Sequence, residues 1–231
     1  MKKTNLLLTL MLFASASISF AQADMKETVA MIKTNLVQSK EKVKQYAWIE
    51  TTKTYIKGEL KSTKQNQCYY SVDGQLTKVA TGGTDQEKKV GGLKGKIIAN
   101  KKEEMADYIA KAIDKIKAYL PPSGEKIQQI YGAGKVSIQI LEPNKKFKLG
   151  FPDYLQQGDA LSISVNKPAQ KLIGLNVSTY IDNPEDKVVF DVTYKDLPDG
   201  TQYPVTTSLV AAAKDLKIVI EQSGFKKGAG L

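Results

Sequence analysis

The 231-residue sequence contains no histidine and no arginine, and it has a single cysteine, Cys68. Without histidine the chain cannot form a Ser-His-Asp or Cys-His nucleophilic centre, and it lacks the commonest protein ligand of zinc and copper. A single cysteine excludes an internal disulfide bond and a metal site built on a cysteine pair. We therefore predict a protein with no cofactor, no metal and no catalytic residues.

The absence of arginine bears on nucleic-acid binding. All 34 basic residues are lysine, set against 24 acidic residues. Lysine lacks the planar guanidinium that reads guanine and clamps phosphate with two hydrogen bonds, so sequence-specific nucleic-acid binding is disfavoured. The lysines are interleaved with glutamates, as in SKEKVKQ and NKKEEM, which is typical of solvated helix faces. Weak affinity for an anionic membrane surface stays open as an alternative.

The N-terminal segment has the layout of a secretory signal. Two lysines precede an apolar run, Leu6–Phe13, which is followed by small residues and Ala21-Gln22-Ala23. The run is too short for a stable membrane-spanning helix, so an uncleaved anchor is the weaker alternative. We predict a signal peptide over 1–23, cleaved between Ala23 and Asp24, with no lipid anchor because no cysteine follows the cleavage point. Cleavage changes the net charge from +10 to 32 − 24 = +8.

Hydrophobic periodicity predicts an amphipathic helix over 24–45 and strands after it. The apolar residues of the helix recur at spacings of three, four and seven: Met25, Val29, Ile32, Leu36 and Val43. The period then changes to two through YAWIETTKTYIKGEL and KSTKQNQCYYSVDGQLTKVAT. Asp73-Gly74 predicts a two-residue hairpin turn of type I′, in which both residues have positive φ. Cys68 lies in the strand before that turn, so we expect it to be buried and unreactive.

The middle of the chain is predicted to connect two groups of strands. The segment 82–99 is basic and rich in glycine, and we expect it to be a flexible loop. A helical crossover follows over 100–132, with a helix capped by Asn100 and stopped by Pro121-Pro122, then a short helix over 124–131. The buried stripe of the longer helix comprises Met105, Ile109, Ile113, Ile116 and Leu120.

From 135 to 227 apolar and polar residues alternate, which predicts about six further strands. The clearest segments are Val136–Ile140, Leu161–Val165, Ile173–Val177, Val188–Tyr194 and Leu216–Ile220. Such alternation leaves one face of each strand in water, so the sheet should be antiparallel. We predict an α+β fold in a single domain, 24–231. Its strongly curved antiparallel sheet, a half-barrel, should hold the amphipathic helices in its concave face, with an apolar pocket between them.

This order of elements resembles the periplasmic lipoprotein-carrier superfamily. The resemblance rests on the signal, the first helix, the strand YAWIETTKTYIKGEL, the hairpin YYSVDGQLTKV, the helical crossover and the closing strand DLKIVIEQSGFKK. That superfamily includes the LolA and LolB carriers and mycobacterial lipid-binding lipoproteins, and the resemblance implies a further branch that binds acyl chains between sheet and helices. LolA-type carriers place an arginine in that cavity. This chain has none, so the resemblance does not extend to lipoprotein shuttling.

We therefore predict a periplasmic binding or carrier protein for an apolar, acyl-chain-like ligand. Six aromatic residues are candidate ligand contacts: Trp48, Tyr55, Tyr70, Phe147, Phe151 and Tyr154. The last three fall in NKKFKLGFPDYLQQGD, which we expect to form a loop at the mouth of the cavity. Packing in the core or in turns is the alternative for each of the six.

Two other classes of function remain as alternatives. The first is a non-enzymatic protein-interaction or chaperone-like module of the cell envelope, with an envelope protein or anionic lipid as partner. The second is an enzyme, whose candidate acids are Asp182, Glu185 and Asp186 in IDNPEDK. That pattern is typical of a turn, and no histidine is available as a general base, so we predict no enzymatic activity.

Overall fold

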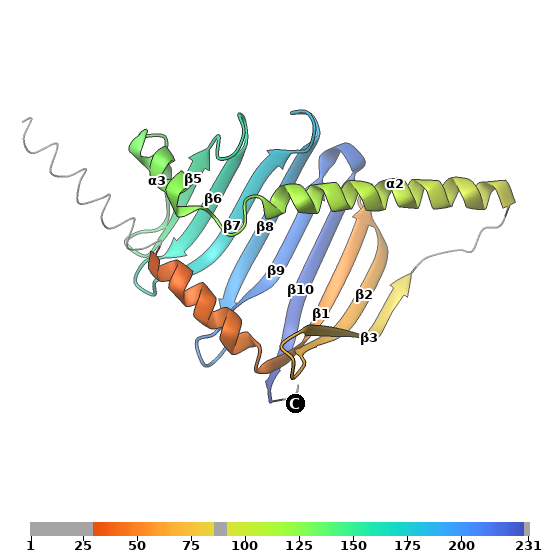
Figure 1. Cartoon of the computed structure of the whole chain (residues 1–231), viewed down its shortest axis with the longest axis horizontal. Helices are drawn as coiled ribbons and strands as arrows, with labels where there is room; N and C mark the ends of the chain where they lie inside the picture. The colour runs from red at the N-terminus through yellow and green to blue at the C-terminus, as the bar shows by residue number, and fades with distance from the viewer. Residues whose placement is uncertain (1–29, 86–91, 229–231) are drawn as a thin grey trace, which may run out of the picture.

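A ten-stranded antiparallel sheet forms the body of the protein in the computed structural model, which describes residues 30–85 and 92–228. In chain order the strands are β1 (Tyr46–Ile56), β2 (Glu59–Tyr70), β3 (Leu76–Asp85), β4 (Ser137–Glu142), β5 (Lys146–Pro152), β6 (Ala160–Asn166), β7 (Lys171–Tyr180), β8 (Lys187–Asp196), β9 (Gln202–Ala211) and β10 (Leu216–Lys227). In space they follow the order β3-β2-β1-β10-β9-β8-β7-β6-β5-β4, so β1 and β10 pair inside the sheet while β3 and β4 form its two edges. The predicted α+β fold with an open, curved antiparallel sheet is confirmed (Figure 1).

The helices lie on one face of this sheet. An N-terminal helix is described over 30–43, and α2 (Gly92–Lys117) and α3 (Gly124–Gly132) connect β3 to β4, where the helical crossover is predicted. A short 3-10 turn, η1 (Ala212–Lys214), joins β9 to β10. Figure 1 shows the N-terminal helix and α2 crossing the same face of the sheet at separate places. The predicted signal peptide and its cleavage point lie outside the described residues.

The buried core fills the interval between these helices and the sheet. Alternate residues of the strands from β5 to β10 point into it, and β6 shows the pattern clearly: Leu161, Ile163 and Val165 are buried, while the serines between them are half-buried. Burial of this alternating face is what holds the helices on the sheet. In contrast, β2 and β3 contribute one buried apolar residue, Cys68, and are otherwise rich in Thr, Lys, Gln and Asn. The apolar face therefore covers only part of the sheet.

The connection predicted as a loop over 82–99 is mostly regular structure. β3 continues to Asp85 and α2 begins at Gly92, so only 86–91 belong to neither element and lie outside the described residues. The predicted helix start at Asn100 is therefore wrong, because Asn100 lies inside α2. Glycine content favours a loop, but one glycine costs a helix only about 1 kcal/mol, and the lysine, leucine and isoleucine around Gly95 are compatible with a helix.

The buried face of α2 also differs from the predicted stripe. Ile113 is 42% exposed, whereas Tyr108, Ala112 and Tyr119 are buried. The other predicted members lie against the core: Met105, Ile109, Ile116 and Leu120. The tyrosines were not predicted in the stripe because their hydroxyl groups need polar partners, which periodicity alone does not reveal.

The β2–β3 hairpin forms where it is predicted, but its turn is of another type. Of its turn residues only Gly74 has a positive φ, of 77°. The Asp73 carboxylate accepts hydrogen bonds from the Ser71 hydroxyl and the Gln75 N–H, and these bonds stabilise a longer loop. Two successive residues with positive φ occur instead between β1 and β2, at Lys57 and Gly58.

Candidate functional site

A set of half-buried apolar side chains borders the core on the helix-covered face. Four come from the sheet and three from the helices, and we call them the inner rim: Ile56, Phe190, Tyr194 and Ile218, with Leu36, Met105 and Ile109. They pack against fully buried residues on one side and keep part of their surface in water on the other. These side chains come from the sheet and from two helices, and they adjoin the core. An apolar ligand could pack against them without breaking any hydrogen bond.

The helices that supply the inner rim leave part of the sheet uncovered. The N-terminal helix lies low across the sheet in Figure 1 and α2 lies high across it, with strands β9 and β10 visible between them. Ile220 on β10, one pleat beyond Ile218, is also half-buried and pairs with Thr52 and Thr207. The inner rim is therefore the border at which the covered part of the sheet meets its open part.

A buried polar network fixes the C-terminal end of α2 on the sheet. The Tyr119 hydroxyl donates to the Asp159 carboxylate at 2.5 Å and lies 2.8 Å from the Thr179 hydroxyl. The same carboxylate accepts the backbone N–H groups of Leu155 (3.1 Å) and Gln156 (2.8 Å). Burial, together with the hydrogen bond to Asp159, raises the pKa of Tyr119 well above its usual range. Tyr119 therefore stays a neutral donor, as the network requires.

A second tyrosine holds α2 further along its length. The Tyr108 hydroxyl donates to Asp186 in the β7–β8 turn, and the Lys214 ammonium lies 5.4 Å from the centre of its ring. Burial and the Asp186 carboxylate raise the pKa of Tyr108. Asp186 is one of the acids in the IDNPEDK turn. There it anchors a helix, and the Asn183 side chain accepts the N–H groups of Glu185 and Asp186, as in a capped turn.

The six aromatic residues predicted to contact a ligand do not come together. Trp48 and Tyr70 meet near one end of β1, with ring centroids 6.1 Å apart. Tyr55 lies near the other end of β1 and lines a pocket with β10 residues. The remaining three are at the β5 end of the sheet: Phe147, Phe151 and Tyr154. The sequence therefore does not predict the grouping of these residues.

Phe147, Phe151 and Tyr154 are predicted to lie in a loop. This prediction is wrong, because Phe147 and Phe151 belong to β5 and only Tyr154 follows that strand. Phe151 and Tyr154 are almost completely buried, and the Tyr154 hydroxyl accepts the Ser123 N–H at the start of α3. The KFKLGFP segment alternates apolar residues with lysine and glycine. Its period of two could have identified it as a strand, but its flanking Pro-Asn and Pro-Asp pairs favour a turn.

Trp48 is part of an aromatic cluster rather than an isolated side chain. Its ring stacks on Phe225 at 5.7 Å, and Phe225 also contacts Tyr46 and Tyr203, at 6.2 and 4.4 Å between centroids. The cluster lies where β10 continues beyond its last pair with β9, Glu221–Thr206. The aromatic cluster therefore packs β10 against its neighbours beyond the point where its hydrogen bonds with β9 end.

Cys68 lies opposite Trp48 in the β1–β2 ladder and is completely buried. Burial raises the pKa of its thiol, and the neighbouring Glu50 carboxylate adds to that effect. Because a raised pKa lowers the thiolate fraction at every pH below it, the thiol should react slowly in the folded protein. The prediction that Cys68 is buried is confirmed.

We expect a thiol reagent such as DTNB at pH 8 to modify native Cys68 at least about 100-fold more slowly than the urea-unfolded chain, since reaction requires local opening. The control places a thiol on the surface: Val72→Cys in a Cys68→Ser background, at a position that is 93% exposed. Equal rates for native Cys68 and this control would show that the β1–β2 ladder does not shield the thiol.

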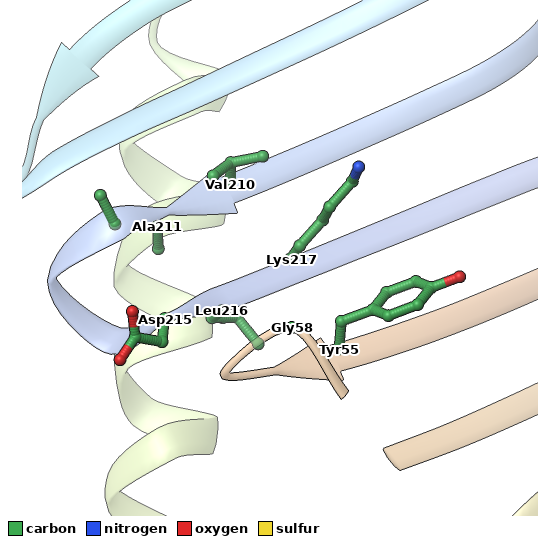
Figure 2. Close-up of a pocket in the computed structure, with 8 residues that line it drawn as sticks. Tyr55, Gly58, Val210, Ala211, Asp215, Leu216 and Lys217 are labelled. Carbon is green, nitrogen blue, oxygen red and sulfur yellow. The ribbon is translucent and has the colours of Figure 1, made fainter. Parts of the chain in front are cut away.

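A pocket of about 550 Å³ lies on the opposite face of the sheet from α2. Figure 2 shows α2 behind the strands, with the Tyr55 and Lys217 side chains extending over the near face. Tyr55 and Lys217 are directly opposite each other on β1 and β10, and the Lys57 N–H donates to the Asp215 carbonyl at 2.8 Å, which joins the two turns above them. The pocket is lined by Tyr55, Gly58, Val210, Ala211, Ala212, Asp215, Leu216 and Lys217. Its charged and phenolic groups suit a small polar molecule better than an acyl chain.

Two further findings concern metal binding and membrane-crossing helices among the described residues. Within 30–85 and 92–228, no three His, Cys, Asp or Glu side chains are grouped so that they could hold a metal ion. In the same part of the chain, no helix is both long enough and apolar enough to cross a membrane.

No protein-family model and no curated protein matches the sequence. Three solved structures match the fold. A DUF1329 family protein from Desulfovibrio piger aligns at 9% identity, with 87% of this chain and 94% of that chain covered, and a TM-score of 0.31. A LolA superfamily protein from Nitrosomonas europaea aligns at 11% identity over 85% and 93% of the two chains, with a TM-score of 0.32.

The third structure is a domain assigned to outer membrane lipoprotein sorting, from Vibrio parahaemolyticus. It aligns at 10% identity over 85% of this chain and 92% of that chain, with a TM-score of 0.32. Similarity at this level concerns the arrangement of helices and strands and does not extend to function.

Proposed function

We propose that the protein binds and carries an apolar, acyl-chain-like ligand between the sheet and the helices, and that the inner rim is the binding surface. The observation that carries the proposal is the rim itself. Seven apolar side chains from the N-terminal helix, α2 and three strands are only half-buried, on a face whose remaining apolar residues form the core. When no ligand is bound, the exposed part of these seven side chains lies in water, and exposed apolar surface of this kind often marks a binding site.

An acyl chain buried on the inner rim would gain enough free energy for measurable binding. Burial of one methylene group is worth about 0.8 kcal/mol, so ten methylenes of an acyl chain correspond to about 8 kcal/mol before the costs of association. A gain of that size corresponds to a micromolar dissociation constant at best. The expected ligand is therefore a long-chain fatty acid or a lipid with at least one long chain, because a short chain would bury too few methylenes.

We also propose that the protein acts in the periplasm after cleavage between Ala23 and Asp24, since the N-terminal sequence has the features of a secretory signal. No enzymatic role is proposed. Of the candidate acids in the IDNPEDK turn, Asp186 is engaged in structure by its hydrogen bond with Tyr108. Among the six predicted aromatic contacts, Phe147 packs half-buried against the same core and is retained as a proposed contact.

The proposal is tested by native mass spectrometry of the purified protein after incubation with a bacterial lipid extract, and by titration with a fluorescent fatty acid. We expect a retained lipid adduct and saturable binding. Met105→Glu places a carboxylate in the inner rim and should weaken binding at least about tenfold, since burial of an unpaired charge is strongly unfavourable.

The matched control is Ile113→Glu, which adds the same charge to the same helix at a side chain that is already 42% exposed. It should leave binding within about twofold of the wild type. The absence of any lipid adduct, or equal loss of binding in both variants, would contradict the proposal.

A further inference from the structure

We propose that the edge strand β4 and its flanking lysines dock the protein on an anionic lipid bilayer. The starting observation is exposure. Ile138 and Ile140 are 59% and 63% exposed, and Leu141 is 47% exposed, so three large apolar side chains lie in water within four residues of one strand. Ile138 and Ile140 are opposite Leu149 and Phe147 on β5, whereas Lys148 is opposite Gln139 and so points to the other face of the sheet. We call the three apolar side chains, with Lys135 and Lys148, the β4 edge patch, which therefore includes both faces of the sheet at this edge.

The net charge around these apolar residues is positive. The segment 135–148 contains four lysines and one acid, which gives 4 − 1 = +3. The acid, Glu142, is already paired with Lys145 at 2.9 Å and Lys146 at 2.8 Å. Within the described part of the chain, Lys135 and Lys148 form no ion pair, so both ammonium groups are available to an external anion. Apolar side chains flanked by lysines are the combination that binds anionic membrane surfaces.

An edge strand could instead receive a strand from another protein, but the geometry of β4 disfavours this. The β4–β5 register shifts between Ile140 and Glu142, which leaves Leu141 as an extra residue in β4, and Pro143 follows the strand directly. β4 itself has six residues. A short strand, a bulge and a proline are the features that block strand addition at sheet edges. Leu141 at the bulge is nevertheless exposed, as Ile138 and Ile140 are, so the edge keeps its exposed apolar side chains.

The opposite edge of the sheet offers a comparison. Val72, at the tip of the β2–β3 hairpin, is 93% exposed. Its neighbour is Asp73, whose pKa is lowered by hydrogen bonds from Ser71 and Gln75, so the tip carries a negative charge at neutral pH. An anionic bilayer would repel this tip, and β3 and β4 are the two ends of the strand order. The hairpin tip at Val72 therefore differs from the β4 edge patch in the sign of its charge.

The test is co-sedimentation of the mature chain with phosphatidylcholine vesicles that contain or lack 30 mol% phosphatidylglycerol, and it requires no carried ligand. We expect binding only to the anionic vesicles, falling at least about tenfold between 50 and 300 mM NaCl. Ile138→Ser/Ile140→Ser should reduce the partition coefficient about tenfold. Lys135→Gln/Lys148→Gln should reduce it about 25-fold, since each lysine near the surface contributes about fivefold.

The matched control is Val72→Ser, which removes a more exposed apolar side chain from the other edge and should change binding by less than about twofold. Circular dichroism of each variant shows whether it is folded. Three results would overturn the proposal: no binding to anionic vesicles, binding unchanged in both double variants, or a dimer in solution that Ile138→Ser/Ile140→Ser dissociates. Vesicle sedimentation tests membrane docking and ligand titration tests the proposed carrier function. The two experiments are independent, so either proposal can be contradicted while the other is supported.

Discussion

Replacing Phe151 with alanine is expected to lower the free energy of unfolding by about 4 kcal/mol. Its side chain is completely buried, and it is opposite Leu161 in the β5–β6 ladder, so truncation leaves a cavity that rigid neighbours cannot fill. The measurement is urea unfolding followed by circular dichroism, with the midpoint shifting and the slope unchanged.

Phe147→Ala is the matched control for this effect. Phe147 points to the same face of the same strand, two pleats away, but it is only half-buried. We expect its loss to cost about 2 kcal/mol, because part of its surface is already in water. Equal destabilisation by the two variants would mean that the exposed part of Phe147 is not accessible in solution, and that the β5 end of the core is more closed than described.

Replacing Asp159 with alanine is expected to cost about 3 kcal/mol. The carboxylate is 3% exposed and accepts hydrogen bonds from Tyr119, Leu155 and Gln156. Its removal leaves two backbone N–H groups without their acceptor and breaks a charge-assisted bond from the tyrosine. Thermal unfolding monitored by circular dichroism provides the measurement.

A double-mutant cycle separates the Tyr119–Asp159 bond from the rest of the network. Tyr119→Phe alone should cost about 1.5 kcal/mol, because its hydroxyl loses both Asp159 and Thr179. The coupling energy between the two substitutions should be about 1 to 2 kcal/mol. Additive effects would contradict a direct interaction between Tyr119 and Asp159.

Periodicity predicted most of the fold because burial imposes it. The alternation in Leu161–Val165 and Leu216–Ile220 arises from one wet and one dry face, and the structure places these segments in β6 and β10. Members of the inner rim such as Ile109, Phe190 and Ile218 belong to stripes that the sequence already reveals. What the sequence did not predict is which of those residues stay half-exposed, since that depends on where the helices cross the sheet.

The residues that fix the helices were harder to predict. Tyr108 lies on α2 and Tyr119 directly follows it, whereas their acceptors Asp186 and Asp159 lie in turns far away in the sequence. No local pattern links such pairs, because each is created by the packing of a helix over a turn. The six aromatic candidates failed as a group for the same reason. Aromatic content marks residues that bury large surfaces, but it does not say whether Trp48 and Phe151 do so in one place or at opposite parts of a sheet.

The most direct test of the account is photo-crosslinking with a sixteen-carbon fatty acid that carries a diazirine near the end of its chain, followed by mass-spectrometric mapping of labelled residues. The account predicts labels on the inner rim, in particular on Met105, Ile109, Phe190 and Ile218, and their loss in Met105→Glu. Labels confined to Tyr55 and Lys217, in the pocket on the opposite face, or no labelling above the level without light, would contradict it.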